Sequence, residues 1–248
     1  MHLDSVLHLM PREGAPSPLY VYLHGAGATA LAMVQVADRF AQAYPQAAHL
    51  IPDGFVGDGA SPGMRGWFPG AVGDDSSLAE RVASSLPALV AFVHDAQRQF
   101  GVTPLATALV GFSQGAIVAL EVAQAHPDLV GRVVAIGGRY VTLPQASPKA
   151  VIHMVHGKDD ATVPARHAVE AATRLLALGA DVTADVVPGI GHAPHPALVE
   201  RALGHLQTFL PRRIWAEALA SAPLMGTRAD SRDLGRRPAT PPAANDPT

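Results

Sequence analysis

Cysteine is absent from the 248-residue sequence, which excludes both a disulfide framework and a cysteine nucleophile. Charge is also scarce, because only 16% of the residues are charged and the formal net charge is −3. A basic surface for nucleic acid or for an anionic membrane is therefore not expected. Long hydrophobic runs are missing as well, since no stretch approaches the roughly 18 apolar residues that a membrane-spanning helix needs.

The N-terminal residues 1–10 have no basic segment followed by a long apolar core, so they do not predict a signal peptide. These absences together favour a cytoplasmic protein without stable membrane insertion. Apolar residues, by contrast, make up 48% of the chain, which is enough for one domain with a sizeable core.

Short apolar runs alternate with helical patterns along residues 1–220. The predicted strands are 2–10, 18–23, 48–51, 105–110, 133–136, 151–155 and 182–187, with a hairpin-like connection over 11–18 between the first two. The predicted helices are 31–43, 74–100, 116–125, 164–178 and 197–210. This alternation predicts a single α/β domain whose mostly parallel sheet is covered by helices on both faces. Residues 212–220 are expected to form a short docked helix, and the apolar-poor residues 221–248 a disordered tail.

The pattern G-x-S-x-G, formed by Gly111, Ser113 and Gly115, stands between a predicted strand and a predicted helix. A sharp strand-to-helix turn leaves little room for side chains beside its central residue, so glycine is required on both sides. The turn exposes the serine hydroxyl at the carboxyl end of the sheet. It also puts the backbone N–H of Gln114 at a helix N-terminus, where it can stabilise an oxyanion. We interpret Ser113 as a catalytic nucleophile.

A serine needs a base, and the base needs an orienting acid. The adjacent Asp159 and Asp160 follow one later strand, and His192 follows the next after a Gly-x-Gly turn. The order serine, acid, histidine is the order of the α/β-hydrolase fold. Residues 24–27 follow an earlier strand, and the backbone N–H of Ala26 is the candidate second oxyanion donor.

The glycine-rich segment 53–73 is longer than an ordinary loop, and it carries Met64, Trp67 and Phe68. Two interpretations stay open for Trp67. It either anchors the loop to the core or walls a substrate pocket.

Three alternatives to a serine hydrolase follow from other features of the sequence. His153 with His156, and His192 with His195, have metal-like spacings, but no acidic cluster accompanies them, so no metal site is predicted. Gly25-Ala26-Gly27 fits a relaxed dinucleotide fingerprint, although no acidic residue lies about 20 residues further on, as that fingerprint requires. A non-catalytic binding protein on the same fold is the remaining alternative.

Taken together, these motifs resemble the small bacterial carboxylesterases of the acyl-protein thioesterase/lysophospholipase family. The resemblance rests on Leu23-His24-Gly25-Ala26-Gly27, Trp67-Phe68, Gly111-Phe112-Ser113-Gln114-Gly115, His156-Gly157 through Val163-Pro164, and Gly191-His192. It implies an α/β-hydrolase that cleaves carboxylic esters, with thioesters or lysophospholipids as further substrate classes, and that needs no cofactor. The natural substrate and the oligomeric state stay open.

The resemblance also implies roles for single residues. It selects Asp160 as the acid, beside Ser113 and His192, with Ala26 and Gln114 as oxyanion donors. Trp67 matches an aromatic residue that flanks the acyl pocket in such enzymes. The residues expected to line the substrate site are Met64, Trp67, Phe68, Phe112 and Val163. Two positions depart from the family: Ala28 stands where aspartate is common, and Ala161 where proline is common.

Overall fold

The computed structural model describes residues 6–57, 63–70, 77–212 and 214. Contacts divide the chain into one unit spanning Met1–Pro211 and a second spanning Arg212–Thr248. The predicted helix over 212–220 lies outside the described residues except for 212 and 214. The predicted tail, 221–248, lies wholly outside them.

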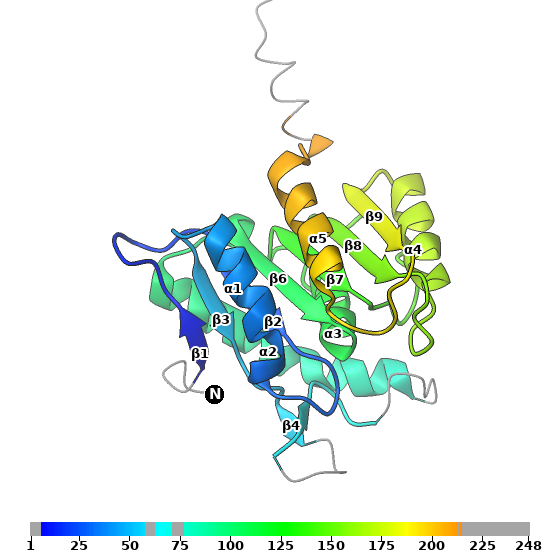
Figure 1. Ribbon diagram of the computed structural model, residues 1–248, viewed down its shortest axis with the longest axis horizontal. Coiled ribbons are helices and arrows are strands. Elements are labelled where there is room, and N and C mark those ends of the chain that lie inside the picture. Colours follow the sequence, from blue (N-terminus) through cyan, green and yellow to red (C-terminus); the bar gives the residue numbers. More distant parts are fainter. Residues whose placement is uncertain (1–5, 58–62, 71–76, 213, 215–248) are drawn as a thin grey trace, which may run out of the picture. The chain divides into compact units, whose positions relative to one another are not determined.

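A seven-stranded sheet in the order β1-β3-β2-β6-β7-β8-β9 forms the centre of the first unit (Figure 1). Its strands are β1 (Leu7–Leu9), β2 (Leu19–Leu23), β3 (Ala48–Ile51), β6 (Thr107–Phe112), β7 (Arg132–Ile136), β8 (Val151–Gly157) and β9 (Val182–Val187). All neighbours are parallel except β1 and β3. Strands β2, β3 and β8 are buried along their whole length, as expected for parallel strands covered on both faces.

Helices cover both faces of this sheet. They are α1 (Val34–Ala43), α2 (Leu78–Phe100), α3 (Gln114–Ala125), α4 (Arg166–Ala177) and α5 (Pro196–Thr208), with short 3₁₀ turns at Ala30–Met33 and Pro104–Ala106. Side chains of α1 and α5 pack in one core layer with Tyr20 and Tyr22 of β2. Those of α2, α3 and α4 pack in the other layer, with Leu19 and Val21. In Figure 1, α1 and α5 lie in front of the sheet, and α2 and α3 lie behind it. The predicted α/β-hydrolase fold is confirmed.

The first strand corrects one prediction. β1 does not form a hairpin with β2. It pairs antiparallel with β3, with Leu7 opposite Ile51 and Leu9 opposite His49. Both edges of β2 are paired, one with β3 and the other with β6. The connection between β1 and β2 therefore passes β3, and β2 lies between β3 and β6.

Two further elements refine the expectations. Helix α2 continues through Pro87 and ends at Phe100; Gly101 follows with a φ of +64°, as the predicted glycine stop requires. Its expected start at Asp74 lies outside the described residues. The glycine-rich segment contains a small antiparallel ribbon of β4 (Val56–Gly57) and β5 (Arg65–Gly66). Among the described helices, none is long and apolar enough to cross a membrane.

Candidate active site

The turn between β6 and α3 has the strained geometry that its glycines predict. Ser113 has a φ of +54° and a ψ of −116°, a conformation that L-residues rarely adopt. A Cβ on Gly111 would lie 2.4 Å from the carbonyl oxygen of Gly115, and a Cβ on Gly115 would lie 2.1 Å from that of Leu23. Only glycine fits at either position, so the backbone packing itself fixes the direction of the Ser113 side chain.

Three side chains from different strand ends meet at this turn. The Nε2 of His192 lies 2.8 Å from the Oγ of Ser113, and its Nδ1 lies 2.7 Å from the Oδ2 of Asp160. Because a carboxylate only accepts, Nδ1 carries the proton and Nε2 is free to accept the serine proton. His192 is partly exposed, whereas Ser113 and Asp160 are buried.

The two candidate acids have different environments. Asp160 is buried, and its Oδ1 accepts hydrogen bonds from the backbone N–H groups of Thr162 (2.9 Å) and Val163 (2.8 Å). Asp159 is exposed and accepts from the N–H of Gly189 instead. The two bonds to the Asp160 Oδ1 also hold the turn that contains Ala161, where the resembled family commonly has proline. Val163 is 1% exposed and contributes through its backbone, so it does not line an open substrate site as expected.

His156, which the sequence places in the His-Gly motif and at a metal-like spacing from His153, lies next to Asp160. Its Nε2 lies 2.7 Å from the carbonyl oxygen of Val163 and 3.3 Å from the Oδ2 of Asp160. Burial lowers the pKa of His156, so the ring stays neutral and donates from Nε2. Its place at the end of β8, four residues before Asp160, is the signal that could have identified it.

The loop after β2 is ordered by the side chain of His24. The backbone N–H of Gly54 donates to its Nε2 (2.8 Å), so Nδ1 carries the proton and donates to the carbonyl oxygen of Gly25 (2.7 Å). The C=O and N–H of one trans peptide point in opposite directions. Holding the Gly25 carbonyl therefore turns the N–H of Ala26 the other way.

Ala26 and Gln114, the two expected oxyanion donors, come from adjoining segments. A Cβ on Gly25 would lie 3.4 Å from the Cβ of Ser113, so the residue before Ala26 packs directly against the serine. Gln114 is the first residue of α3, whose first N–H groups lack partners within the helix. Among the described residues, neither backbone N–H donates a hydrogen bond to the protein.

Other residues form the hydrogen bonds around Ala28, the position at which the resembled family commonly has aspartate. The carbonyl oxygen of Ala28 accepts from the N–H of Arg65 (2.9 Å), and Arg65 Nε donates to the carbonyl oxygen of Gly54. The Oδ1 of Asp53 accepts from the N–H of Ala30 (2.6 Å). The loop after β2 is thus tied to β5 and to the residues that follow β3.

The large apolar residues expected to line the substrate site differ in how far they are exposed. Trp67 and Phe68 are only 1% and 2% exposed, so they do not line an open pocket, and Trp67 has the contacts of a loop anchor. Met64 is 40% exposed. Phe112 is half-buried, and its ring centroid lies 4.9 Å from that of His192.

The metal-like histidine spacings do not bring histidines together. His153 and His156 are three residues apart on β8 and therefore point to opposite faces of the sheet. His153 bonds to Thr183 and Arg132, on the side away from Asp160. In the described part of the chain, no three His, Cys, Asp or Glu side chains cluster as metal ligands would.

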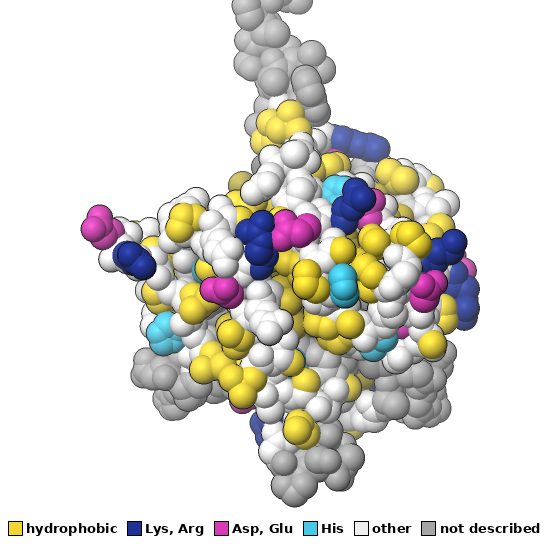
Figure 2. Space-filling model, viewed as in Figure 1, with side chains coloured by type: hydrophobic (Ala, Val, Ile, Leu, Met, Phe, Trp, Pro, Cys, Tyr) yellow, Lys and Arg dark blue, Asp and Glu magenta, His cyan; other side chains and the backbone are white. Residues whose placement is uncertain are grey.

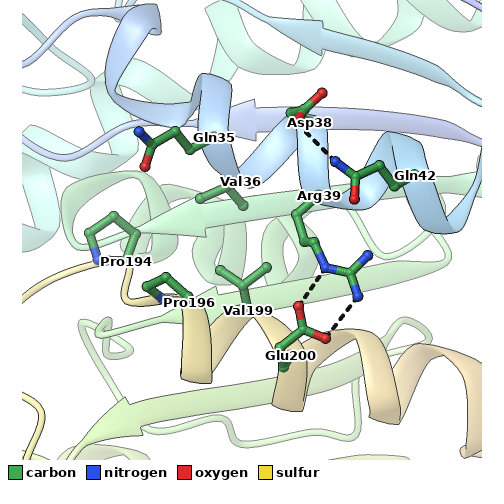
Figure 3. Close-up of a pocket in the computed structure, with 9 residues that line it drawn as sticks. All are labelled: Gln35, Val36, Asp38, Arg39, Gln42, Pro194, Pro196, Val199 and Glu200. Atoms are coloured by element: carbon green, nitrogen blue, oxygen red, sulfur yellow. Dashed lines mark hydrogen bonds and ion pairs between the residues drawn. The ribbon is translucent and has the colours of Figure 1, made fainter.

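A separate pocket of about 230 Å³ lies between α1 and α5 (Figure 3). It is lined by Gln35, Val36, Asp38, Arg39, Gln42, Pro194, Pro196, Val199 and Glu200. An exposed ion pair between Arg39 and Glu200 bridges the two helices. Figure 2 shows that acidic, basic and apolar side chains are mixed on this face of the molecule. None of the pocket's lining residues belongs to the Ser113 site.

A mostly parallel sheet with serine, aspartate and histidine at the ends of β6, β8 and β9 defines a protein of the α/β-hydrolase class. Residues 8–210 match the profile of the phospholipase/carboxylesterase family, and the chain belongs to that family. Esterase YpfH of Escherichia coli (strain K12) is 37% identical over 203 residues, which cover 82% of this chain and 87% of that protein. The predicted resemblance is confirmed.

Solved structures agree with this assignment. The crystal structure of esterase PE8 has a TM-score of 0.75 and 26% sequence identity, covering 83% of this chain and 99% of that one. A carboxylesterase from Mesorhizobium loti has the same fold, with a TM-score of 0.67 and 20% identity over 79% of this chain and 90% of that one. The predicted class, an esterase-type hydrolase, is confirmed, and the dinucleotide alternative is not supported.

Proposed function

We propose that this protein hydrolyses carboxylic esters of small molecules through an acyl-enzyme formed on Ser113. The observation that carries the proposal is the continuous hydrogen-bonded chain from the Ser113 hydroxyl through His192 to the buried carboxylate of Asp160. With Nδ1 donating to the carboxylate, the Nε2 of a neutral His192 ring is the acceptor that faces the Ser113 hydroxyl, as the first step needs.

In acylation, the His192 Nε2 takes the hydroxyl proton while the Ser113 Oγ attacks the ester carbonyl carbon. The carbonyl oxygen becomes an oxyanion, which the N–H groups of Ala26 and Gln114 and the N-terminus of α3 stabilise. The imidazolium then gives its proton to the leaving alcohol oxygen as the bond between carbon and that oxygen breaks. The Asp160 carboxylate stabilises the imidazolium during this step.

Deacylation repeats the sequence with water as the nucleophile. His192 takes a proton from the water, whose oxygen attacks the acyl carbon and forms a second oxyanion in the same place. Collapse of this intermediate breaks the bond to the Ser113 Oγ, which recovers its proton from the imidazolium. The carboxylic acid product leaves, and no step requires a redox change.

Oxygen esters are the proposed principal substrates, with thioesters and lysophospholipids as finer alternatives within the same chemistry. Support for the ester class comes from the family assignment and from relatives that are named esterases. The partly exposed His192 beside Phe112 is consistent with a site that is open to solvent rather than deeply enclosed.

The test is hydrolysis of p-nitrophenyl esters of increasing acyl length, alongside an acyl thioester and a lysophospholipid, by the parent and by Ser113→Ala. The proposal predicts release of p-nitrophenol by the parent and a loss on the order of 10⁶ in kcat in the variant, if chemistry is rate-limiting. Activity in the variant within tenfold of the parent would exclude Ser113 as the nucleophile. The ratio of rates across the three substrate types then selects among the finer alternatives.

A further inference from the structure

We propose that the side chains of Gln114 and Trp67 form a brace that fixes the distance between the two oxyanion donors. In this inference, which rests on the proposed function, both are positioning residues. Gln114 would then act twice, through its backbone N–H on the oxyanion and through its side-chain amide on the loop that carries Trp67.

Both polar atoms of the Gln114 side-chain amide form hydrogen bonds. Its Oε1 accepts a hydrogen bond from the backbone N–H of Trp67 (2.6 Å), and its Nε2 donates to the carbonyl oxygen of Phe68 (2.8 Å). The residue is 1% exposed, so water does not replace either partner. The residue directly after the nucleophile is thereby bonded to the end of β5, more than 40 residues away in the sequence.

Trp67 carries the connection to the other donor. Its indole Nε1 donates to the carbonyl oxygen of His24 (2.8 Å), and the two rings lie 5.4 Å apart. Phe55 packs edge-on against the indole, with 5.2 Å between centroids. His24 in turn holds the Gly25 carbonyl, which orients the Ala26 N–H. Trp67 thus joins the two segments, because its backbone N–H bonds to Gln114 and its indole bonds to His24.

Two glycines allow this close packing. A Cβ on Gly66 would lie 2.9 Å from the Gln114 Oε1, and a Cβ on Gly54 would lie 2.3 Å from the carbonyl oxygen of Gly66. Because Gly54 also donates to His24, the ribbon that carries Trp67 is held at both ends. No described polar side-chain atom of Gln114, Trp67 or His24 is buried without a partner.

The brace matters because oxyanion donors act only within a narrow range of distance. Loss of one donor costs about 10²–10³ in kcat in a serine hydrolase, and misplacement by about 1 Å can cost about 10². A substitution at Gln114 keeps its backbone N–H. Any loss of transition-state stabilisation in such a variant therefore reports on the side chain alone.

The experiment compares the parent with Gln114→Met, which keeps the length of the side chain and removes both hydrogen bonds. Two quantities are measured: kcat and KM for p-nitrophenyl butyrate, and Ki for a trifluoromethyl ketone. The serine oxygen adds to the ketone carbon to form a hemiketal oxyanion, so this inhibitor reports directly on the donors. We expect kcat to fall by about 10- to 100-fold with KM within about threefold, and the inhibitor to weaken in parallel with kcat.

Gln97→Met is the matched control. Gln97 is also a buried glutamine whose amide donates to two partners, Thr107 Oγ1 (3.1 Å) and the Leu129 carbonyl oxygen (2.8 Å), at the other end of the sheet. Its loss should lower the melting temperature, as in Gln114→Met, but leave kcat and Ki unchanged. This comparison separates a general loss of packing from a displaced oxyanion site.

If Gln114→Met does not fold, Trp67→Phe tests the brace, because it keeps an aromatic ring and removes only the indole N–H donor. It should show the same parallel fall in kcat and inhibitor affinity, at a smaller size. Either folded variant with kcat and Ki within twofold of the parent would overturn the brace. Failure of the trifluoromethyl ketone to inhibit the parent would instead contradict the proposed serine mechanism.

Discussion

The Nδ1 of His192 lies 2.7 Å from the Oδ2 of Asp160, and the second oxygen of that carboxylate accepts two backbone hydrogen bonds. This arrangement fixes both the position and the rotation of the carboxylate before substrate binds. The adjacent Asp159 accepts a hydrogen bond from the N–H of Gly189 instead, so the two neighbouring aspartates have different partners.

Asp160→Asn should reduce kcat by at least about 10²-fold. The amide keeps the shape but loses the charge that stabilises the imidazolium, and in serine proteases the same change costs about 10⁴. Asp159→Asn is the matched control and should stay within a few-fold of the parent. Ester hydrolysis rates of the two purified variants check this prediction, and the reverse pattern would make Asp159 the acid.

Trp67→Ala should lower activity by a similar factor for every acyl length, together with the melting temperature. Its side chain is 1% exposed and bonded to His24, so its loss removes an anchor rather than a pocket wall. Truncation of a buried tryptophan typically costs about 3–5 kcal/mol of stability. The check is kcat/KM across p-nitrophenyl esters from acetate to octanoate. A change in preferred acyl length at unchanged stability would restore the pocket-wall interpretation.

Stability should fall as the pH falls below about 6.5, in part because of His153. Burial, and then the nearby Arg132 and His205, lower the pKa of His153 to about 3, so it stays neutral in the folded state. The unfolded chain binds this proton below its ordinary pKa of about 6.5. The free energy of unfolding should therefore drop by about 2 kcal/mol between pH 7 and pH 5 from this residue alone.

Urea unfolding of the parent and of His153→Gln at the two pH values measures this contribution. The variant should be less stable at pH 7, because the His153 bonds to Thr183 and Arg132 are lost, but its stability should depend less on pH. His94→Gln, at an exposed position of α2, should keep the pH dependence of the parent. An identical slope in the parent and in His153→Gln would contradict the assignment.

Features set by local backbone geometry could be predicted from the sequence. The glycines around Ser113 predict the strained turn. Ser113, Asp160 and His192 each follow a predicted strand, and this predicts their order along the sheet edge. The range of β9, 182–187, agrees with the prediction residue for residue, because its pattern is bounded by turn residues.

Features that depend on contacts distant in sequence could not be predicted in this way. The pairing of β1 with β3 is decided by which sheet edge is free, and nothing in residues 7–9 encodes that. The burial of Trp67 depends on His24 and Gln114, which are 43 and 47 residues away. The side-chain roles of His24, Gln114 and His156 likewise emerge only when separate strand ends come together.

The most direct test of the central claim is the site of covalent modification by a fluorophosphonate, identified by peptide mass spectrometry. The claim is that Ser113 is the nucleophile and His192 its base. We expect one adduct per chain, located on Ser113, with loss of esterase activity in proportion to labelling. Labelling should be absent in Ser113→Ala and slowed by at least about 10²-fold in His192→Ala. An adduct on another residue, or full esterase activity in fully labelled protein, would contradict the account.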